Sequence, residues 1–296
     1  MGWGGQAGRQ VPAACRGEAQ GRPRNTWRRL LSNRATVPSL IVLALVVLMG
    51  AFAPYLAEYD PIRQNMRARL QGPSAEHWMG TDELGRDVFA RIAFGARTSL
   101  LTALAGALLG TLCGTVLGLF SGYWGGRVDD LLMRLADVML SFPAILLCIL
   151  IVSLLGPGLD NLIIAVAVWN TPGFARIVRA NVLSIREKEF VEAARSVGSG
   201  AARTMWRHIL PNTMSPIVVQ ATLAVPWALL TAAGLGFLGL GAQPPAPEWG
   251  AMISSGRHHI RDAIHLALFP GLAIAVTVLA ISFLGDALRD ALDPRL

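Results

Sequence analysis

Charged residues are scarce in this sequence, and lysine occurs only once. Charged side chains make up 15% of the 296 residues, whereas hydrophobic side chains make up 53%. A soluble domain of this length needs more polar surface than that to cover its core. The composition therefore excludes an ordinary soluble globule and indicates that lipid surrounds much of the chain.

The single lysine, Lys188, excludes a nucleotide-binding loop. A Walker-type loop needs the pattern Gly-x-x-x-x-Gly-Lys-Ser/Thr, because its lysine reaches the terminal phosphates. Lys188 lies in Arg-Glu-Lys-Glu with no glycine before it. The sequence also lacks the His-Glu-x-x-His and Gly-x-Ser-x-Gly patterns and paired intramembrane aspartates. We expect neither an ATPase nor a membrane enzyme, and no cofactor bound by this chain itself.

Cysteine is nearly absent as well. Cys15, Cys113 and Cys148 are far apart, and the last two lie in apolar runs, where they act as small hydrophobic residues. The net charge of +7 is compatible with nucleic-acid binding, but the arginines cluster beside apolar runs and not among aromatic residues that would stack on bases. We expect no disulfide framework, no zinc site and no nucleic-acid partner.

Long apolar runs, in contrast, recur along the chain. A helix needs about 20 mostly apolar residues to cross roughly 30 Å of hydrocarbon. Six segments qualify: 37–56, 99–120, 138–155, 162–178, 217–240 and 264–284. The fourth contains Asn170, Pro172 and Arg176, but it is needed to return the chain to the side of its N-terminus. The sequence predicts an all-α membrane protein with six transmembrane helices, and a membrane-parallel helix at about 86–95 in the loop 57–98.

Lysine and arginine are distributed unevenly between the loops. Of these 26 residues, 18 lie in 1–35, 121–135, 176–213 and 287–296, and 8 lie in 57–98 and 241–263. Because loops rich in positive charge stay in the cytoplasm, both termini are expected there. No span centre holds Lys, Arg, Asp or Glu, whereas ion-coupled carriers place such groups at their working sites. This absence argues against a stand-alone secondary carrier, which stays as an alternative.

Glycine recurs at every fourth residue of the second predicted span. Gly106, Gly110, Gly114 and Gly118 fall on one stripe of a helix, where they let a second helix approach closely. We interpret the stripe as a helix-packing surface, with a pore-lining role as the alternative.

Residues 187–213 form the most informative stretch. Two apolar faces with helical spacing occur in it: Phe190, Val191, Ala194 and Val197, and then Ala202, Met205, Trp206 and Ile209. Gly198 is placed to end the first helix, and Pro211 to stop the second. The pattern predicts two short amphipathic helices on the cytoplasmic side, with an apolar face that needs a partner.

This stretch resembles the EAA loop of ABC importer permeases. It contains Glu192-Ala193-Ala194, then Gly198 after three residues, and Ile209-Leu210-Pro211 after ten more. In that family, a short coupling helix in this loop docks on the ATPase subunit. The resemblance implies that these seven residues form an ATPase-coupling site, with a helix lying on the inner leaflet as the alternative.

Other stretches narrow the resemblance to the C-type permease subunits of dipeptide, oligopeptide and nickel ABC importers. They are residues 28–34, 77–87, 237–241, 243–245, 248–250 and 285–295. One departure is Ala232, because relatives often carry glutamate there. Any role of an acidic group at that position therefore does not transfer to this chain.

The resemblance implies an ABC importer permease fold and a set of partners. The expected domains are a disordered cytoplasmic tail (1–27), an anchor helix with an outer loop (28–98), a five-helix transport core (99–286) and a second cytoplasmic tail (287–296). The transport core would contain the EAA loop at 187–213.

The resemblance also implies partner proteins. In the bacterial inner membrane, the chain would pair with a homologous second permease. Two ATP-binding subunits, which bind ATP and Mg²⁺, and an extracytoplasmic substrate-binding protein would complete the importer. Di- or oligopeptides are the expected substrates, and nickel is the alternative.

Histidines near the last outer loop raise the question of a metal site. If that loop were helical, His258, Asp262 and His265 would share one face, but Arg261 would lie on the same face and repel a cation. We expect ordinary polar loop residues and no metal site.

Overall fold

The computed structural model describes residues 35–292, which form an all-helical bundle. Within these residues no strand occurs, and one isolated bridge joins Thr81 to Asp87. The all-α prediction is confirmed. The expected tail at 1–27 lies outside the described residues. The expected cytoplasmic tail at 287–296 stays a prediction, and its residues up to Leu292 continue the last helix.

The helices follow one another in a simple order. They are α2 (Thr36–Ala51), α3 (Ala53–Leu56), α4 (Val88–Trp124), α5 (Gly126–Leu140), α6 (Ala144–Leu155), α7 (Leu159–Arg186), α8 (Glu189–Ser196), α9 (Ala201–Thr204), α10 (Leu210–Phe237), α11 (Trp249–Gly256) and α12 (His265–Leu292). Short 3-10 turns occur at Met66–Ala68 and Arg257–His259, and a π turn at Met205–Ile209 joins α9 to α10.

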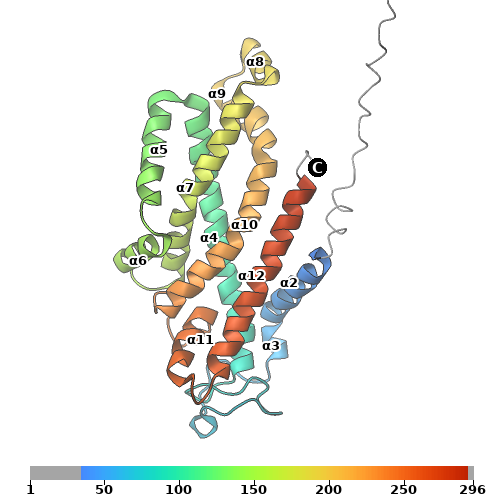
Figure 1. Ribbon diagram of the computed structural model, residues 1–296, viewed down its shortest axis with the longest axis vertical. Coiled ribbons are helices and arrows are strands. Elements are labelled where there is room, and N and C mark those ends of the chain that lie inside the picture. The colour runs from blue at the N-terminus through green and yellow to red at the C-terminus, as the bar shows by residue number, and fades with distance from the viewer. Residues whose placement is uncertain (1–34, 293–296) are drawn as a thin grey trace, which may run out of the picture.

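The two ends of the bundle carry different elements. In Figure 1, α8 and the end of α12 lie at one end, and the loop 57–87 lies with α11 at the other. α2 packs beside α12 and leads to α3 near the loop end. This arrangement brings the stretch 187–213 and the C-terminal end of α12 to the same end of the molecule.

Fewer helices than expected are long enough to span a bilayer. Within residues 35–292, four helices qualify by length and composition: α4, α7, the continuous helix Ala201–Phe237, and α12. A fifth span results if α5 and α6 act together, although they are bent by 95° at their junction. α2 is apolar but has only 16 residues. The predicted count of six is therefore not confirmed, although each predicted segment overlaps an apolar helix.

Proline accounts for the two interrupted spans. Pro143 has an extended backbone, with ψ of 136°, and a proline disfavours helical conformation in the residue before it. The predicted span 138–155 is therefore broken between α5 and α6. The predicted span 37–56 is broken at Phe52, because Pro54 lacks the N–H that would continue α2.

The loop before α4 contains no separate helix at 86–95, so the expectation of a membrane-parallel helix there is wrong. Residues from Val88 onwards form the first turns of α4, because Asp87 caps that helix by accepting a hydrogen bond from the Ala90 N–H at 2.7 Å. Arg91 in the second turn is buried and donates to the Pro61 carbonyl oxygen at 3.0 Å. The cap and this bond extend α4 beyond its apolar run.

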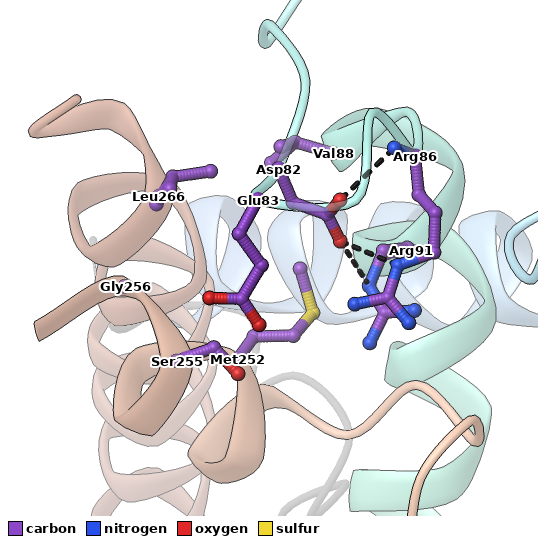
Figure 2. A pocket seen from close by; sticks show the side chains of 9 residues that line it. All are labelled: Asp82, Glu83, Arg86, Val88, Arg91, Met252, Ser255, Gly256 and Leu266. Atoms are coloured by element: carbon purple, nitrogen blue, oxygen red, sulfur yellow. Dashed lines mark hydrogen bonds and ion pairs between the residues drawn. The ribbon is translucent and has the colours of Figure 1, made fainter. Parts of the chain in front are cut away.

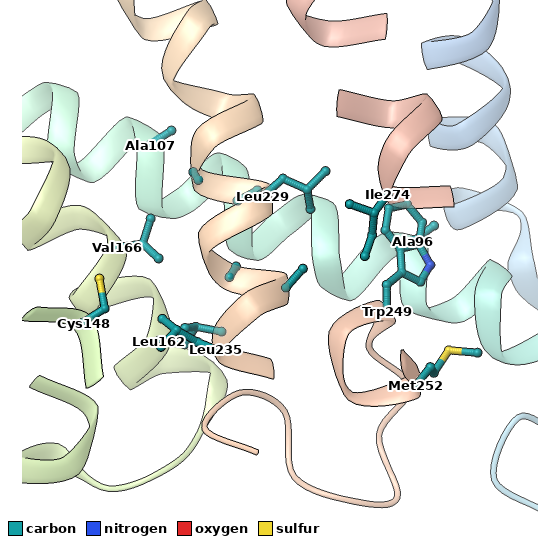
Figure 3. Close-up of a cluster of buried hydrophobic side chains, with 14 of the residues drawn as sticks. Ala96, Ala107, Cys148, Leu162, Val166, Leu229, Leu235, Trp249, Met252 and Ile274 are labelled. Atoms are coloured by element: carbon teal, nitrogen blue, oxygen red, sulfur yellow. The ribbon is translucent and has the colours of Figure 1, made fainter. Parts of the chain in front are cut away.

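The main apolar core joins α4, α6, α7, α10, α11 and α12, and part of it is drawn in Figure 3. Trp249 at the start of α11 is fully buried there, and its indole N–H donates to the Ile92 carbonyl oxygen at 3.1 Å. Glu248 caps α11 by accepting two backbone N–H bonds, and burial raises the pKa of its carboxyl group. Ala232 is only 3% exposed in this core, so a glutamate at that position would lie among apolar neighbours.

α4 and α7 pack along the predicted glycine stripe. A Cβ atom added at any of the four glycines would lie within 2.8 Å of α7. The residues met are Val166, Asn170, Phe174 and Ala175, which face Gly106, Gly110, Gly114 and Gly118 in that order. Gly122 meets Val182 one turn further on. The two helix backbones therefore approach so closely that no side chain fits between them.

Gly118→Ala should destabilise the fold by about 1–3 kcal/mol, the usual cost of inserting a methyl group where no space exists. The new Cβ would lie 2.6 Å from the carbonyl oxygen of Ala175, a backbone atom that cannot easily move aside. Thermal unfolding in detergent measures this loss. Gly234→Ala is the matched control, because a Cβ there meets nothing within 4 Å. An equal loss in both variants would contradict the packing interpretation.

Candidate functional site

The stretch 187–213 begins with one short, well-defined helix. α8 ends at Ser196, and Gly198 follows with φ of +84°, a conformation that glycine adopts without strain. The Gly198 N–H donates to the Arg195 carbonyl oxygen at 2.9 Å, and the Ser199 N–H donates to that of Ala194 at 3.0 Å. These bonds close the helix end in the way expected from the sequence.

The second predicted helix is not a separate element. α9 continues through the π turn Met205–Ile209 directly into α10, so Pro211 does not stop the run. Pro211 lies in the first turn of α10, where its missing N–H is tolerated. The π turn stands immediately before it, and such turns accommodate interruptions of the helical bonding ladder. The predicted hairpin is therefore one short helix followed by the start of a long span.

The inner side of α8 is anchored in a second apolar cluster. Val191 is fully buried there together with Ile209 from the π turn. The rest of the cluster comes from α4, α7 and α10, as Leu119, Val178, Val182, Ile185 and Ile217. The guanidinium of Arg195 also lies over the Tyr123 ring, 5.1 Å from its centroid, a favourable cation–π contact. α8 is thereby attached to three long helices at once, α4, α7 and α10.

Charged side chains brace the same end of the bundle. Arg179 on α7 pairs with Asp129 on α5, with both N–O distances at 2.5 Å, and Ser121 on α4 also donates to Asp129. Arg186 donates to the carbonyl oxygens of Gly122 and Tyr123 at 3.1 and 3.2 Å. The sequence analysis missed Arg179 and Arg186, because their partners lie 50 or more positions away and no spacing pattern links them.

The outer side of α8 presents a mixed surface. Glu192, Ala193 and Gly198 are exposed on it. Large apolar side chains accompany them, with exposed fractions of 40% for Phe190 and 84% for Val197. On the α9–α10 side, Trp206 is 52% exposed. We name the surface formed by these six residues the α8 face. Exposed apolar groups rimmed by charge are typical of protein interaction sites.

The seven residues singled out by the EAA resemblance do not all lie on this surface. Glu192, Ala193 and Gly198 belong to the α8 face. Pro211, in the first turn of α10, is also exposed. Ala194 and Ile209 are buried, and Leu210 is half-buried. The structure thus divides the set into an exposed group and a group that supports the segment from inside.

The histidines between α11 and α12 have different partners. His265 is buried, with its Nε2 atom 3.3 Å from the Thr81 carbonyl oxygen, whereas His258 is bonded to Arg257 at the surface. Across residues 35–292, no three His, Cys, Asp or Glu side chains are grouped closely enough to hold a metal ion.

The stretch 77–87 folds around a buried carboxylate, shown in Figure 2. Asp82 pairs with Arg86 at 2.6 Å and with Arg91 at 3.5 Å, and it also accepts two backbone N–H bonds. Asp87 pairs with His77 at 2.9 Å. The adjoining cavity measures about 20 Å³, which is room for about one water molecule. These residues fix the loop 57–87 onto α4 and leave no space for a larger ligand.

Two family descriptions match this chain. Residues 114–296 match the family described as "Binding-protein-dependent transport system inner membrane component". Residues 24–73 match the "N-terminal TM domain of oligopeptide transport permease C".

Individual relatives cover most of the chain. The dipeptide transport system permease protein DppC of Alkalihalophilus pseudofirmus is 48% identical over 92% of this chain and 90% of its own length. The glutathione transport system permease protein GsiD of Pectobacterium atrosepticum is 46% identical over 92% of this chain and 91% of its own. Among solved structures, an inward-facing MetNI methionine ABC transporter chain superposes with a TM-score of 0.56 at 20% identity, over 69% of this chain and 96% of that one. The last likeness concerns the fold alone.

Val191→Ala should loosen α8 from the bundle. Removing two buried methyl groups costs about 1.5–3 kcal/mol, and each 1.4 kcal/mol is a factor of ten in the local opening equilibrium. Amide hydrogen exchange across residues 189–198 of the isolated chain should therefore accelerate by roughly tenfold or more. Val197→Ala removes the same two groups from a side chain that is 84% exposed. If Val197→Ala accelerated exchange as much, the buried anchor would not hold the helix.

Proposed function

The chain belongs to the family of inner-membrane components of binding-protein-dependent transport systems, and we propose that it is the membrane-spanning permease subunit of an ATP-driven importer of di- or oligopeptides. The observation that carries the substrate class is the identity of 46–48%, over nine-tenths of the chain, to permeases named for dipeptide and glutathione transport. Glutathione is itself a tripeptide, so both relatives are named for short peptides.

The importer has four further components in this proposal. A homologous second permease completes the path through the bacterial inner membrane, two ATP-binding subunits hold ATP and Mg²⁺, and an extracytoplasmic binding protein delivers the substrate. The absence of a Walker loop around Lys188 supports a separate source of energy. The exposed apolar side chains of the α8 face support a protein partner at that end of the bundle.

The α8 face is the proposed docking surface for an ATP-binding subunit. α8 follows α7 directly, and the segment after it runs without a break into α10. A displacement of α8 by the partner would therefore move both long helices together, because Val191 and Ile209 belong to one buried cluster. A switch between two states of the bundle needs only a few kcal/mol of differential contact with the partner.

The cytoplasmic position of both termini follows from the same assignment. The stretch 176–213 holds 7 of the 26 lysines and arginines, and α8 shares one end of the bundle with the end of α12 (Figure 1). Positive charge at this end supports a cytoplasmic location.

The purified five-component complex in proteoliposomes tests the function. It should accumulate a labelled dipeptide only when ATP is supplied on the side of the ATPases, and it should not accumulate Ni²⁺. Uptake of Ni²⁺ without uptake of peptide would contradict the proposed substrate, and peptide uptake by this chain without ATPases would contradict the proposed mechanism.

A paired substitution in the α8 face serves as the mechanistic control. Glu192→Ala combined with Gly198→Asp should lower ATPase co-purification and peptide uptake by at least about tenfold, the effect of losing a central interface residue. Tyr55→Ala changes a side chain that is 87% exposed in α3, near the opposite end, and should leave ATPase co-purification unchanged.

A further inference from the structure

A cavity of about 650 Å³ lies between α7, α10 and α12, with Leu140 at the end of α5 on its edge. Its volume falls in the range of roughly 300–1,000 Å³ that is usual for small-molecule sites. α10 lies between α7 and α12 and packs against both (Figure 1). The cavity is therefore walled by the same two helices that lead into and out of the stretch 187–213.

One side chain in the wall carries an unused hydrogen-bonding group. Asn170 is 9% exposed and lines the cavity, and its amide nitrogen is buried without a hydrogen-bond partner within the described part of the chain. A buried donor that lacks a partner has lost its bonds to water and gained nothing in return. Because this nitrogen is itself buried, the amide must rotate about its Cβ–Cγ bond before the nitrogen can meet a partner in the cavity.

Two further polar groups line the same cavity from the other helices. Gln220 on α10 contributes a second amide, and Asp286 on α12 contributes an exposed carboxylate. Among residues 35–292, no Lys, Arg or His forms an ion pair with Asp286. The wall thus combines hydrogen-bonding amides with one carboxylate that has no ion-pair partner among residues 35–292, while Trp169 and Trp227 supply large apolar surfaces.

These groups match the chemistry of a short peptide. Every peptide with a free amino terminus carries an ammonium group, which a carboxylate binds through a charge-assisted hydrogen bond. Its backbone amides both donate and accept, as the side chains of Asn170 and Gln220 do. Its side chains vary, and flat indole surfaces accept varied apolar groups without specific bonding.

We propose that this cavity binds the peptide in transit, with Asp286 holding the ammonium group at its amino terminus and Asn170 and Gln220 bonding its backbone. This inference rests on the proposed function, since it names the permease's own binding site for the same substrate. It makes Asp286 a specificity-determining residue that selects peptides with a free amino terminus, independently of any choice made by the external binding protein.

Protection of an introduced cysteine tests the site directly. Ser282 lines the cavity, so Ser282→Cys places there a thiol that a maleimide alkylates. The chain's own cysteines are replaced, and the variant is assembled with its partner subunits but without the external binding protein. Trialanine should slow this alkylation, and N-formyl-trialanine, which lacks the ammonium group, should need a concentration about tenfold higher for half-protection.

Substitutions then assign the roles. Asp286→Asn should raise the half-protection concentration of trialanine about tenfold and leave that of the formyl peptide within about twofold. Asn170→Ala should raise both by a similar factor, because both peptides share their backbone amides. Asp290→Asn is the matched control: it removes the same charge one helical turn further along α12, outside the cavity wall, and should change neither value.

The outcomes separate this inference from the proposed function. If the Ser282→Cys complex, supplied with the external protein, imports trialanine with ATP but trialanine gives no protection, the inference is overturned and the proposed function stands. The inference is also overturned if Asp286→Asn raises the half-protection concentrations of both peptides equally, or if Asp290→Asn has the same effect as Asp286→Asn. If the complex imports no peptide at all, the proposed function fails and this inference fails with it.

Discussion

The close approach of α4 and α7 along the glycine stripe is the constraint on which the rest of the bundle depends. Because no side chain fits between these helices at Gly106 through Gly118, their backbones are in direct contact over several turns. The second apolar cluster lies at the end of this contact and is completed by Val191 and Ile209. Arg186 ties α7 to α4, whereas Asp129 ties α5 to both helices through Arg179 on α7 and Ser121 on α4. A rigid unit therefore extends from the middle of the bundle to α8.

Rigidity at this point has a mechanical consequence. Packed helices shift between discrete arrangements and do not deform continuously. A force applied to the α8 face cannot be absorbed by α8 alone, since its inner side is fixed to α4, α7 and the start of α10. The cavity that carries Asn170, Gln220 and Asp286 is walled by α7 and α10, so both proposed sites share their supporting helices. Coupling between ATP-driven closure and peptide release would need no additional moving part.

Much of this organisation could be predicted from the sequence, and the failures have physical causes. The apolar runs predicted the positions of the long helices. Gly198 was expected to end α8, and it follows that helix with a positive φ, a conformation that favours glycine. Pro143 broke a span that hydropathy alone counts as continuous, whereas Pro211, expected to stop a helix, lies in its first turn after a π turn. Helical periodicity also placed Val197 beside Val191, but one is exposed and the other buried, because burial depends on which helix lies opposite. Pairings such as Asp129 with Arg179 are set by the packing of α5 on α7 and leave no local signal.

The central claim is that the α8 face lies in the cytoplasm and is covered by an ATP-binding subunit. A single cysteine at Ser196, which is exposed on α8, measures both properties when an impermeant maleimide is added to the assembled importer. The account predicts no labelling from outside intact cells, slow labelling in inside-out vesicles, and fast labelling once the ATPases are stripped from those vesicles. Labelling from outside intact cells, or a rate that does not change when the ATPases are removed, would contradict it.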